Sequence, residues 1–225
     1  MKYSIYARYV PAVLTSIPLL AFYFFFLRRD LGEFLSFLNW FQFIKDMSLI
    51  SIFIFIVSFF SRYISKYVFE DIIFEKKKKF PTTEFLMPWN DFLSKNTKDK
   101  ICHMIESDIG IKIVSNDNTE NTDREMRKRI VESIKYISNS LRDWIHVLNR
   151  NIEYGFMRNF IWGSVMAFII SIIWICFSNY PGLAFNIFTF FIVAYGSAII
   201  FSKKILRSLA ETYAETLLLE YISKK

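Results

Sequence analysis

Four long runs of apolar residues, separated by polar segments, set the pattern of this chain. The clearest run, 159–178, has no charged side chain. At about 1.5 Å per helical residue, a run of this length crosses the ~30 Å hydrocarbon core of a bilayer. Similar runs cover about 4–27, 47–64 and 183–202. The pattern therefore predicts four transmembrane helices.

The segments between the runs predict how the spans are connected. The short connection 179–182, with the sequence NYPG, has Pro and Gly at turn-forming positions, so we expect spans three and four to form a hairpin. The segment 28–46 mixes charged residues with Leu and Phe at helical spacing, which is typical of a helix lying in the membrane interface. In the first span, Pro11 and Pro18 lie on about the same helix face, and each removes a backbone hydrogen bond. We favour a structural bend there over a gating element.

The polar segment 62–158 holds most of the charge and reads as helical. The second span is expected to continue past Arg62. A short helix is predicted from a cap at Thr97 to a stop at Gly110. Thr122 and Glu125 then have capping-box spacing. Beyond them, apolar residues recur in steps of four and three at Ile130, Ile134, Ile137, Leu141, Trp144 and Leu148.

These steps form a heptad seam. Because no Pro occurs between Thr122 and Pro181, we expect one helix that runs from Thr122 into the third span. The seam either packs within the chain, on the helices 62–72 and 97–109, or pairs between subunits. We favour packing within the chain because those two helices need a surface on which to bury their apolar stripes.

The elements together predict an all-α protein with four transmembrane helices in two hairpin-like pairs. The expected parts are a first pair at 1–61, a cytoplasmic helical domain at 62–158 inserted between spans two and three, a second hairpin at 159–202 and an amphipathic cytoplasmic helix at 203–225. Basic residues gather at the span ends that join 62–158 and the termini, whereas the opposite side has Arg28, Arg29 and Lys45. Because Lys and Arg favour cytoplasmic loops, we expect an inner-membrane protein with both termini in the cytoplasm.

Composition and charge support a membrane protein and do not require an acidic partner. The chain is 53% hydrophobic and 19% aromatic, and its formal charge of +7 fits the basic bias of cytoplasmic loops. The run Lys76, Lys77, Lys78 and Lys79 is expected to contact anionic lipid headgroups, at about 1 kcal/mol per residue. Direct nucleic-acid binding is the alternative, and we disfavour it because the run has no aromatic stacking platform.

The candidate chemistry points away from an enzyme. The chain has no GxSxG, P-loop, HExxH or CxxC motif, and we assign no catalytic residue, cofactor site or metal site. Cys102 and Cys176 show no metal-binding spacing. The spans have no charged residue in their middles, which disfavours an active transporter. Asn186 is the candidate intramembrane polar contact, either between helices or in a pore.

A cluster of polar residues marks the start of the third span. It comprises Glu153, Tyr154, Gly155, Arg158 and Asn159, and we consider it a candidate for coupling the helix to the membrane. One interpretation is an anchor at headgroup depth. The other is a switch that passes movement of the long helix to the span through Gly155 and Gly163. We favour the anchor.

The segments FPTTEFL, DKI…IESDIGI, RKRIVESI and NIEYGFMRN, within about 80–170, resemble a group of small uncharacterised prokaryotic four-pass inner-membrane proteins. That group is associated with anti-phage defence loci, and its motifs carry no known chemistry. The resemblance implies a bacterial inner-membrane protein that acts as a membrane effector.

Three classes of function remain from the sequence. The preferred hypothesis is a non-enzymatic, homo-oligomeric effector whose cytoplasmic domain receives a signal or partner and whose spans alter membrane integrity. The second is a channel or transporter. The third is an adaptor that tethers a soluble cytoplasmic partner protein at the membrane.

Overall fold

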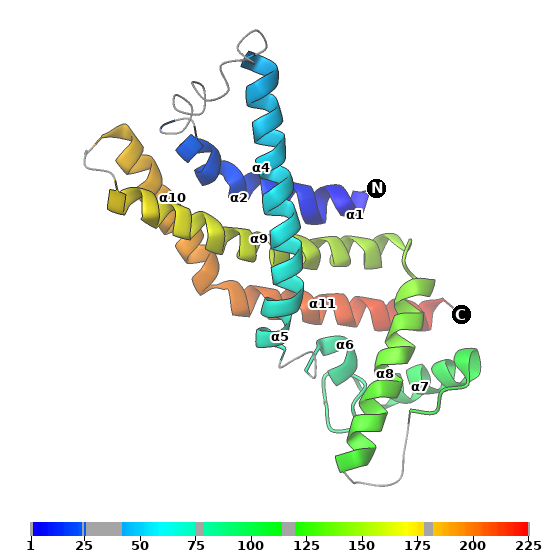
Figure 1. Cartoon of the computed structure of the whole chain (residues 1–225). Coiled ribbons are helices and arrows are strands. Elements are labelled where there is room, and N and C mark those ends of the chain that lie inside the picture. The colour runs from blue at the N-terminus through cyan, green and yellow to red at the C-terminus, as the bar shows by residue number, and fades with distance from the viewer. Residues whose placement is uncertain are drawn as a thin grey trace. The chain divides into compact units, whose positions relative to one another are not determined.

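The computed structural model describes residues 2–23, 25, 42–74, 79–113, 120–177 and 182–224, and across these ranges every regular element is a helix. Four of the helices are long and apolar enough to cross a membrane: Lys2–Phe22, Ile50–Ile73, Ile145–Cys176 and Leu183–Ile200. Figure 1 shows them as α2, α4, α9 and α10, with their helical extensions. The predicted all-helical fold with four candidate spans is therefore confirmed.

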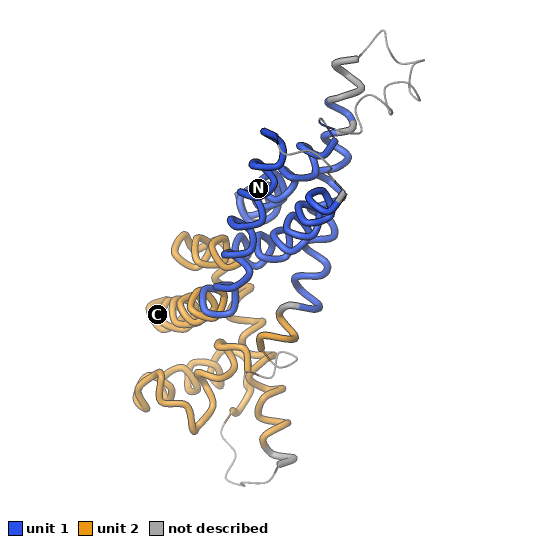
Figure 2. Tube along the Cα trace, turned by 90° about the vertical axis from the view of Figure 1, so that its left-hand side faces the viewer, with its two compact units in different colours: residues 1–69, 155–205 blue, residues 70–154, 206–225 orange. Residues whose placement is uncertain are grey.

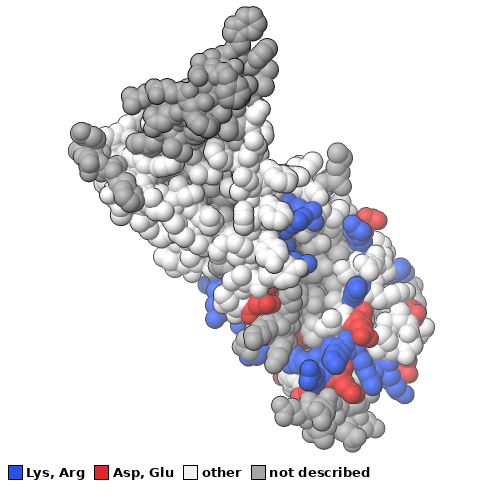
Figure 3. All heavy atoms as spheres, in the orientation of Figure 1, with Lys and Arg blue, Asp and Glu red and all other residues white. Residues whose placement is uncertain are grey.

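The chain divides into two compact units (Figure 2). Unit 1 comprises Met1–Phe69 and Gly155–Ile205, and unit 2 comprises Glu70–Tyr154 and Leu206–Lys225. On the face drawn in Figure 3, charged side chains gather over α7 and α8 of unit 2, and a broad uncharged surface covers the helices of unit 1. This contrast in surface chemistry is expected if unit 1 contacts lipid.

Unit 1 contains the apolar helices. Its elements are α1 (Lys2–Ser4), η1 (Ile5–Tyr9), α2 (Val10–Phe22), α4 (Gln42–Ile64), η4 (Ser65–Phe69), most of α9 (Ile145–Phe177), α10 (Leu183–Ile200) and the first turn of α11 (Ser202–Ser223). The two segments η1 and η4 are π-helical, with a wider turn than the flanking α-helices. The second span thus continues as helix beyond Arg62, as predicted, through η4 into α5 (Glu70–Ile73).

Unit 2 is built around one hydrophobic core. Helices α5, α6 (Pro81–Glu84), α7 (Lys95–Ile109) and α8 (Glu120–Ser140) belong to it, together with the start of α9 and the rest of α11. Ile130 and Ile137 of the predicted seam are buried with Ile101 and Ile105 of α7. The seam therefore packs within the chain, as we favoured. Helix α11 adds Ala214, Leu217, Leu218 and Tyr221 to the same core.

The predicted continuous helix from Thr122 into the third span is wrong. Helix α8 ends at Ser140, and α9 begins at Ile145. Leu141 and Val147 are both buried in the core. In one straight helix, six residues of separation would turn these side chains about 240° apart. The interruption at 141–144 lets both side chains reach the same core.

Two predicted helix caps are also wrong, because the helices begin earlier. The N-cap of α7 is Ser94, whose hydroxyl accepts a hydrogen bond from the Thr97 amide at 3.3 Å. Helix α8 already includes Glu120, so Thr122 lies inside it. The predicted stop at Gly110 is confirmed, because Gly110 adopts the left-handed conformation (φ 70°) that favours glycine.

The helix 62–72 does not bury the apolar stripe that we expected it to bury on the seam. Tyr63, Tyr67 and Ile72 are 58%, 51% and 70% exposed. Several predictions lie outside the described residues: most of the interfacial segment 28–46, the lysines Lys76, Lys77 and Lys78, the loop 114–119, and the connection 178–181.

Candidate functional site

The centre of the candidate site is a hydrogen bond between the third span and the first. Pro11 has no backbone N–H, so it cannot form the α-helical hydrogen bond to the carbonyl of Ala7. The side chain of Asn159, in α9, supplies a donor instead, because its Nδ2 lies 2.6 Å from the Ala7 oxygen. Asn159 is 2% exposed, and Ala7 is fully buried. A backbone acceptor released by proline is thus satisfied by one side chain from another helix.

The same amide also binds the second span. Ser65 Oγ donates to Asn159 Oδ1 at 2.8 Å, so that one side chain joins three helices. Ala7 lies in η1 and Ser65 lies in η4. The π-helical segments η1 and η4 therefore meet at Asn159. Such local distortions are frequent at functional sites.

The second proline of the first span has a matching arrangement. Pro18 removes the α-helical donor for the carbonyl of Leu14, and the hydroxyl of Tyr195, in α10, donates to that oxygen at 2.7 Å. Tyr195 is 7% exposed. Pro11 and Pro18 thus each release one carbonyl, and each carbonyl is held by a different span. We call the Asn159–Ala7 and Tyr195–Leu14 hydrogen bonds the two proline latches.

Small residues on α9 bring the helices close enough for these bonds. Gly155, Asn159, Gly163, Ala167 and Ser171 recur every four residues, and all are buried. A Cβ atom at Gly155 would lie 2.9 Å from Tyr3 Oη, and one at Gly163 would lie 2.3 Å from Thr15 Oγ1. Stripes of small residues permit this close approach in membrane helices. The contacts advance in the same direction along both helices, so α9 runs parallel to the first span.

The structure brings only part of the predicted coupling cluster together. Gly155 and Asn159 belong to the stripe on the first span, and Arg158 is half-buried. Within unit 2, Glu153 is exposed and pairs with Arg150 at 2.8 Å. Tyr154 is buried, and its hydroxyl donates to the buried Glu70 carboxylate at 3.0 Å.

The other predicted contacts are solvent- or lipid-accessible. Lys79 is exposed. Asn186 is also exposed, on the free side of α10, and it is not part of the Asn159 cluster.

Unit 2 has hollows of its own, and two of them bear on the candidate chemistry. An open groove of about 670 Å³ runs between the start of α9 and the end of α11, lined by His146, Asn149, Arg150, Glu153, Thr216, Leu219, Glu220 and Ser223. A smaller cavity of about 330 Å³ lies beside Cys102. Burial, reinforced by Asp99, raises the pKa of the Cys102 thiol. A raised pKa lowers the thiolate fraction, so this position is unfavourable for a nucleophile.

Sequence reasoning found Asn159 and both prolines but missed Ala7, Leu14, Ser65 and Tyr195. A proline in a helix identifies the carbonyl four residues before it, so Ala7 and Leu14 were readable in principle. Their side-chain donors were not, because they come from spans far away in the sequence. Comparisons with protein-family models, curated proteins and solved structures found no match to this chain.

Proposed function

We propose that this chain is a non-enzymatic, four-span inner-membrane effector that acts as a homo-oligomer and alters membrane integrity when unit 2 receives a signal or partner. In this proposal unit 2 is the cytoplasmic domain, both termini are cytoplasmic, and α9 and α10 form the second hairpin. The assignment to prokaryotic anti-phage defence rests on the sequence resemblance alone.

The packing within unit 1 supports the proposed topology. Because α9 runs parallel to the first span, the N-terminus and the residues before Gly155 belong on the same side of the membrane. The ring centroids of Trp174 and Phe188 lie 4.3 Å apart, and those of Phe160 and Tyr195 lie 6.4 Å apart. The later residue of α9 thus contacts the earlier residue of α10, which supports an antiparallel α9–α10 pair. The basic residues at these span ends then favour the cytoplasm for the shared side.

The Asn159 contact also gives a reference level for the spans. About eighteen helical residues, or about 27 Å, separate Asn159 from Phe177, the last residue of α9. This length matches a bilayer core of about 30 Å. Half-exposed tyrosines lie within a turn of the same level, at Tyr6, Tyr9 and Tyr63. Tyrosine is enriched at membrane interfaces, so we place the Asn159 contact near the inner headgroups.

The observation that carries the proposed function is the pair of proline latches. Each holds the first span through one side-chain hydrogen bond, where a continuous helix would use its own backbone. Breaking one such bond leaves its buried acceptor unpaired at about 1–3 kcal/mol, so a movement that breaks a latch weakens the hold on the first span. Helix α9 carries both Tyr154, bound within unit 2, and Asn159, which holds the first span. A movement of α9 would therefore reach a latch directly.

Membrane potential in living cells tests this proposal. We expect Asn159→Leu to depolarise cells at an expression level at which the wild-type chain does not, because the substitution releases the first span. Gly182→Ala is the matched control, since a Cβ there meets nothing within 4 Å. A potential-sensitive dye provides the measurement. Full polarisation in cells whose membranes contain inserted Asn159→Leu protein would contradict the proposal.

An adaptor role is the second candidate, and the groove on unit 2 favours it. Its α9 and α11 faces offer His146, Arg150 and Glu220, among others, to a polar helix or loop of a soluble protein. Co-purification of one stoichiometric soluble subunit, lost on Arg150→Glu, would favour the adaptor. In that case the Asn159→Leu protein would leave the membrane potential intact.

A further inference from the structure

Helix α10 has one packed side and one free side. Phe188 and Tyr195, seven residues apart, are buried against unit 1. On the opposite side, Asn186, Val193 and Ile200 also recur every seven residues, and all three are exposed. Val193 and Ile200 are 66% and 78% exposed. A repeat of seven on one helix face is the spacing by which two helices interlock.

Asn186 is the residue on this face that lipid cannot satisfy. Thr189 Oγ1 donates to the Phe185 carbonyl at 2.9 Å, and Ser197 Oγ donates to the Ala194 carbonyl at 2.8 Å. The Asn186 side chain forms no hydrogen bond to any residue that the structure describes. Its amide has two donor hydrogens and an acceptor oxygen, and hydrocarbon chains pair with neither.

The depth of Asn186 keeps it below the outer headgroups. Leu14 lies seven residues beyond Ala7, and Tyr195, which binds the Leu14 carbonyl, lies nine residues after Asn186. With α10 antiparallel to the first span, these steps place Asn186 about 24 Å from the level of Ala7. In a hydrocarbon core of about 30 Å, the amide is then inside the core, and its short side chain does not reach bulk water.

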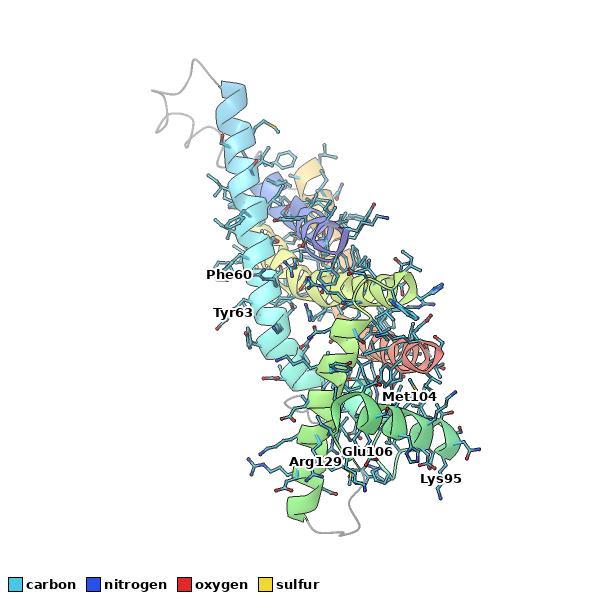
Figure 4. The ribbon with its side chains drawn as sticks, turned by 90° about the vertical axis from the view of Figure 1, so that its right-hand side faces the viewer. Phe60, Tyr63, Lys95, Met104, Glu106 and Arg129 are labelled. Carbon is cyan, nitrogen blue, oxygen red and sulfur yellow. The ribbon has the colours of Figure 1, made fainter. Side chains whose placement is uncertain are left out.

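Helix α4 shows what a face for lipid looks like in the same unit. Its span is nearly as little buried as α10, although α2 packs against its other side, and its exposed side has Ile52, Phe55, Phe59, Phe60 and Tyr63. Figure 4 shows Phe60 and Tyr63 on the side of α4 that faces away from the other helices. Lipid tails satisfy such a surface without any partner protein. The free face of α10 differs from it by one unsatisfied amide.

We propose that the Asn186–Val193–Ile200 face of α10 binds the same face of a second copy of this chain. A second copy is the occupant that the chemistry selects, because two asparagine amides satisfy each other as donor and acceptor. A single polar residue in an apolar seven-residue repeat also fixes the register of two identical helices. The inference deepens the proposed function, since it gives the proposed homo-oligomer its interface.

Disulfide cross-linking in native membranes tests the interface. The background is the full chain with Cys102→Ser and Cys176→Ser, which removes both native thiols. In that background Val193→Cys is compared with Phe59→Cys, at the exposed face of α4. We expect a cross-linked dimer from Val193→Cys at roughly fivefold or more the yield from Phe59→Cys. Equal yields, or cross-links from Val193→Cys to a different protein, would overturn the proposal.

The amide itself is tested by a second substitution in the Val193→Cys background. Asn186→Leu keeps the helix apolar and is expected to reduce the dimer yield by roughly fivefold or more, as interhelical hydrogen bonds of this kind do in model peptides. Thr189→Val is the control, since the Thr189 hydroxyl already has a partner in its own helix. An unchanged yield with Asn186→Leu would refute the role of the amide. If the dimer is cross-linked but the membrane potential of the cells never changes, the interface is supported and only the proposed effector function is refuted.

Discussion

The side chain of Asn159 donates a hydrogen bond of 2.6 Å to the carbonyl oxygen of Ala7, 152 residues earlier in the chain. That carbonyl needs an outside donor because Pro11 cannot supply the α-helical one. One proline and one asparagine thus define how the first and third spans meet. Because Pro11→Ala would restore a backbone donor for the Ala7 carbonyl, mutation can isolate the contribution of the Asn159 hydrogen bond.

Asn159→Leu is expected to destabilise the protein, and Pro11→Ala is expected to reverse part of that loss. The first change leaves the buried Ala7 carbonyl without its side-chain donor, at about 1–3 kcal/mol, whereas the Ser65 hydroxyl keeps the Arg62 carbonyl as an acceptor at 3.3 Å. The second restores a backbone N–H four residues after Ala7, which can bond to the Ala7 carbonyl once the π-helical turn η1 tightens to an α-helix. Thermal unfolding in detergent, followed by circular dichroism, gives the four free energies of this double-mutant cycle.

The control for this cycle is Pro18→Ala, which restores the donor for Leu14 and leaves Ala7 as it is. It should not rescue Asn159→Leu. Rescue of Asn159→Leu by both proline substitutions alike would show that the stabilisation comes from general helix propensity and that the latch has no specific role.

Tyr195→Phe tests the second latch in the reverse combination. Removing the hydroxyl leaves the Leu14 carbonyl without its donor at 2.7 Å, so we expect a loss of about 1–2 kcal/mol. Pro18→Ala should recover most of it, and Pro11→Ala should not. The same unfolding assay measures both. An unaltered stability in Tyr195→Phe would mean that water or the helix itself satisfies Leu14.

Gly163→Ala is expected to separate the first span from α9. The new Cβ would lie 2.3 Å from Thr15 Oγ1 and 2.7 Å from Thr15 Cβ, and the buried Thr15 has little room to move. Overpacking of this kind costs about 1–3 kcal/mol. Gly182→Ala, at a position with nothing within 4 Å, is the control. If both variants unfold at the wild-type temperature, the close contact at Gly163 is absent in the folded protein.

Alkaline pH is expected to destabilise unit 2 through Tyr221. Burial, and then the hydrogen bond from its hydroxyl to Asp108 at 2.8 Å, raise the pKa of Tyr221 above its ordinary value of 10.0. The unfolded chain therefore releases this proton at a lower pH than the folded chain, and stability falls as the pH rises above about 10. Tyr221→Phe should flatten that fall. An equal slope in the wild-type chain and in Tyr221→Phe would contradict the assignment.

The length of the uncharged apolar runs and the helical spacing of apolar residues were enough to predict the helices and the four candidate spans. The seam through Ile130 and Ile137 was predicted for the same reason, because its spacing leaves one face to bury. The end of α8 at Ser140 was missed because no residue in 141–144 breaks a helix by itself. The break is imposed by the core, which requires both Leu141 and Val147.

Only some residues of the candidate site were predicted from the sequence, and their partners on the other helices were not. Asn159 stood out as a polar residue at the start of a span, and Pro11 as a break in the backbone pattern. Nothing local connects them, and the same holds for Tyr195 and Pro18. Hydrogen bonds across spans depend on which helices are neighbours, and that is decided by the close packing at small residues such as Gly163.

Accessibility of single cysteines in intact cells tests the central claim most directly, namely that four spans hold unit 2 on the cytoplasmic side. In a chain without native cysteines, Lys128→Cys marks the exposed face of α8 and Gly182→Cys marks the connection before α10. A thiol reagent that does not cross the inner membrane should label Gly182→Cys in intact cells, and Lys128→Cys only after the inner membrane is permeabilised. Labelling of Lys128→Cys in intact cells would contradict the account.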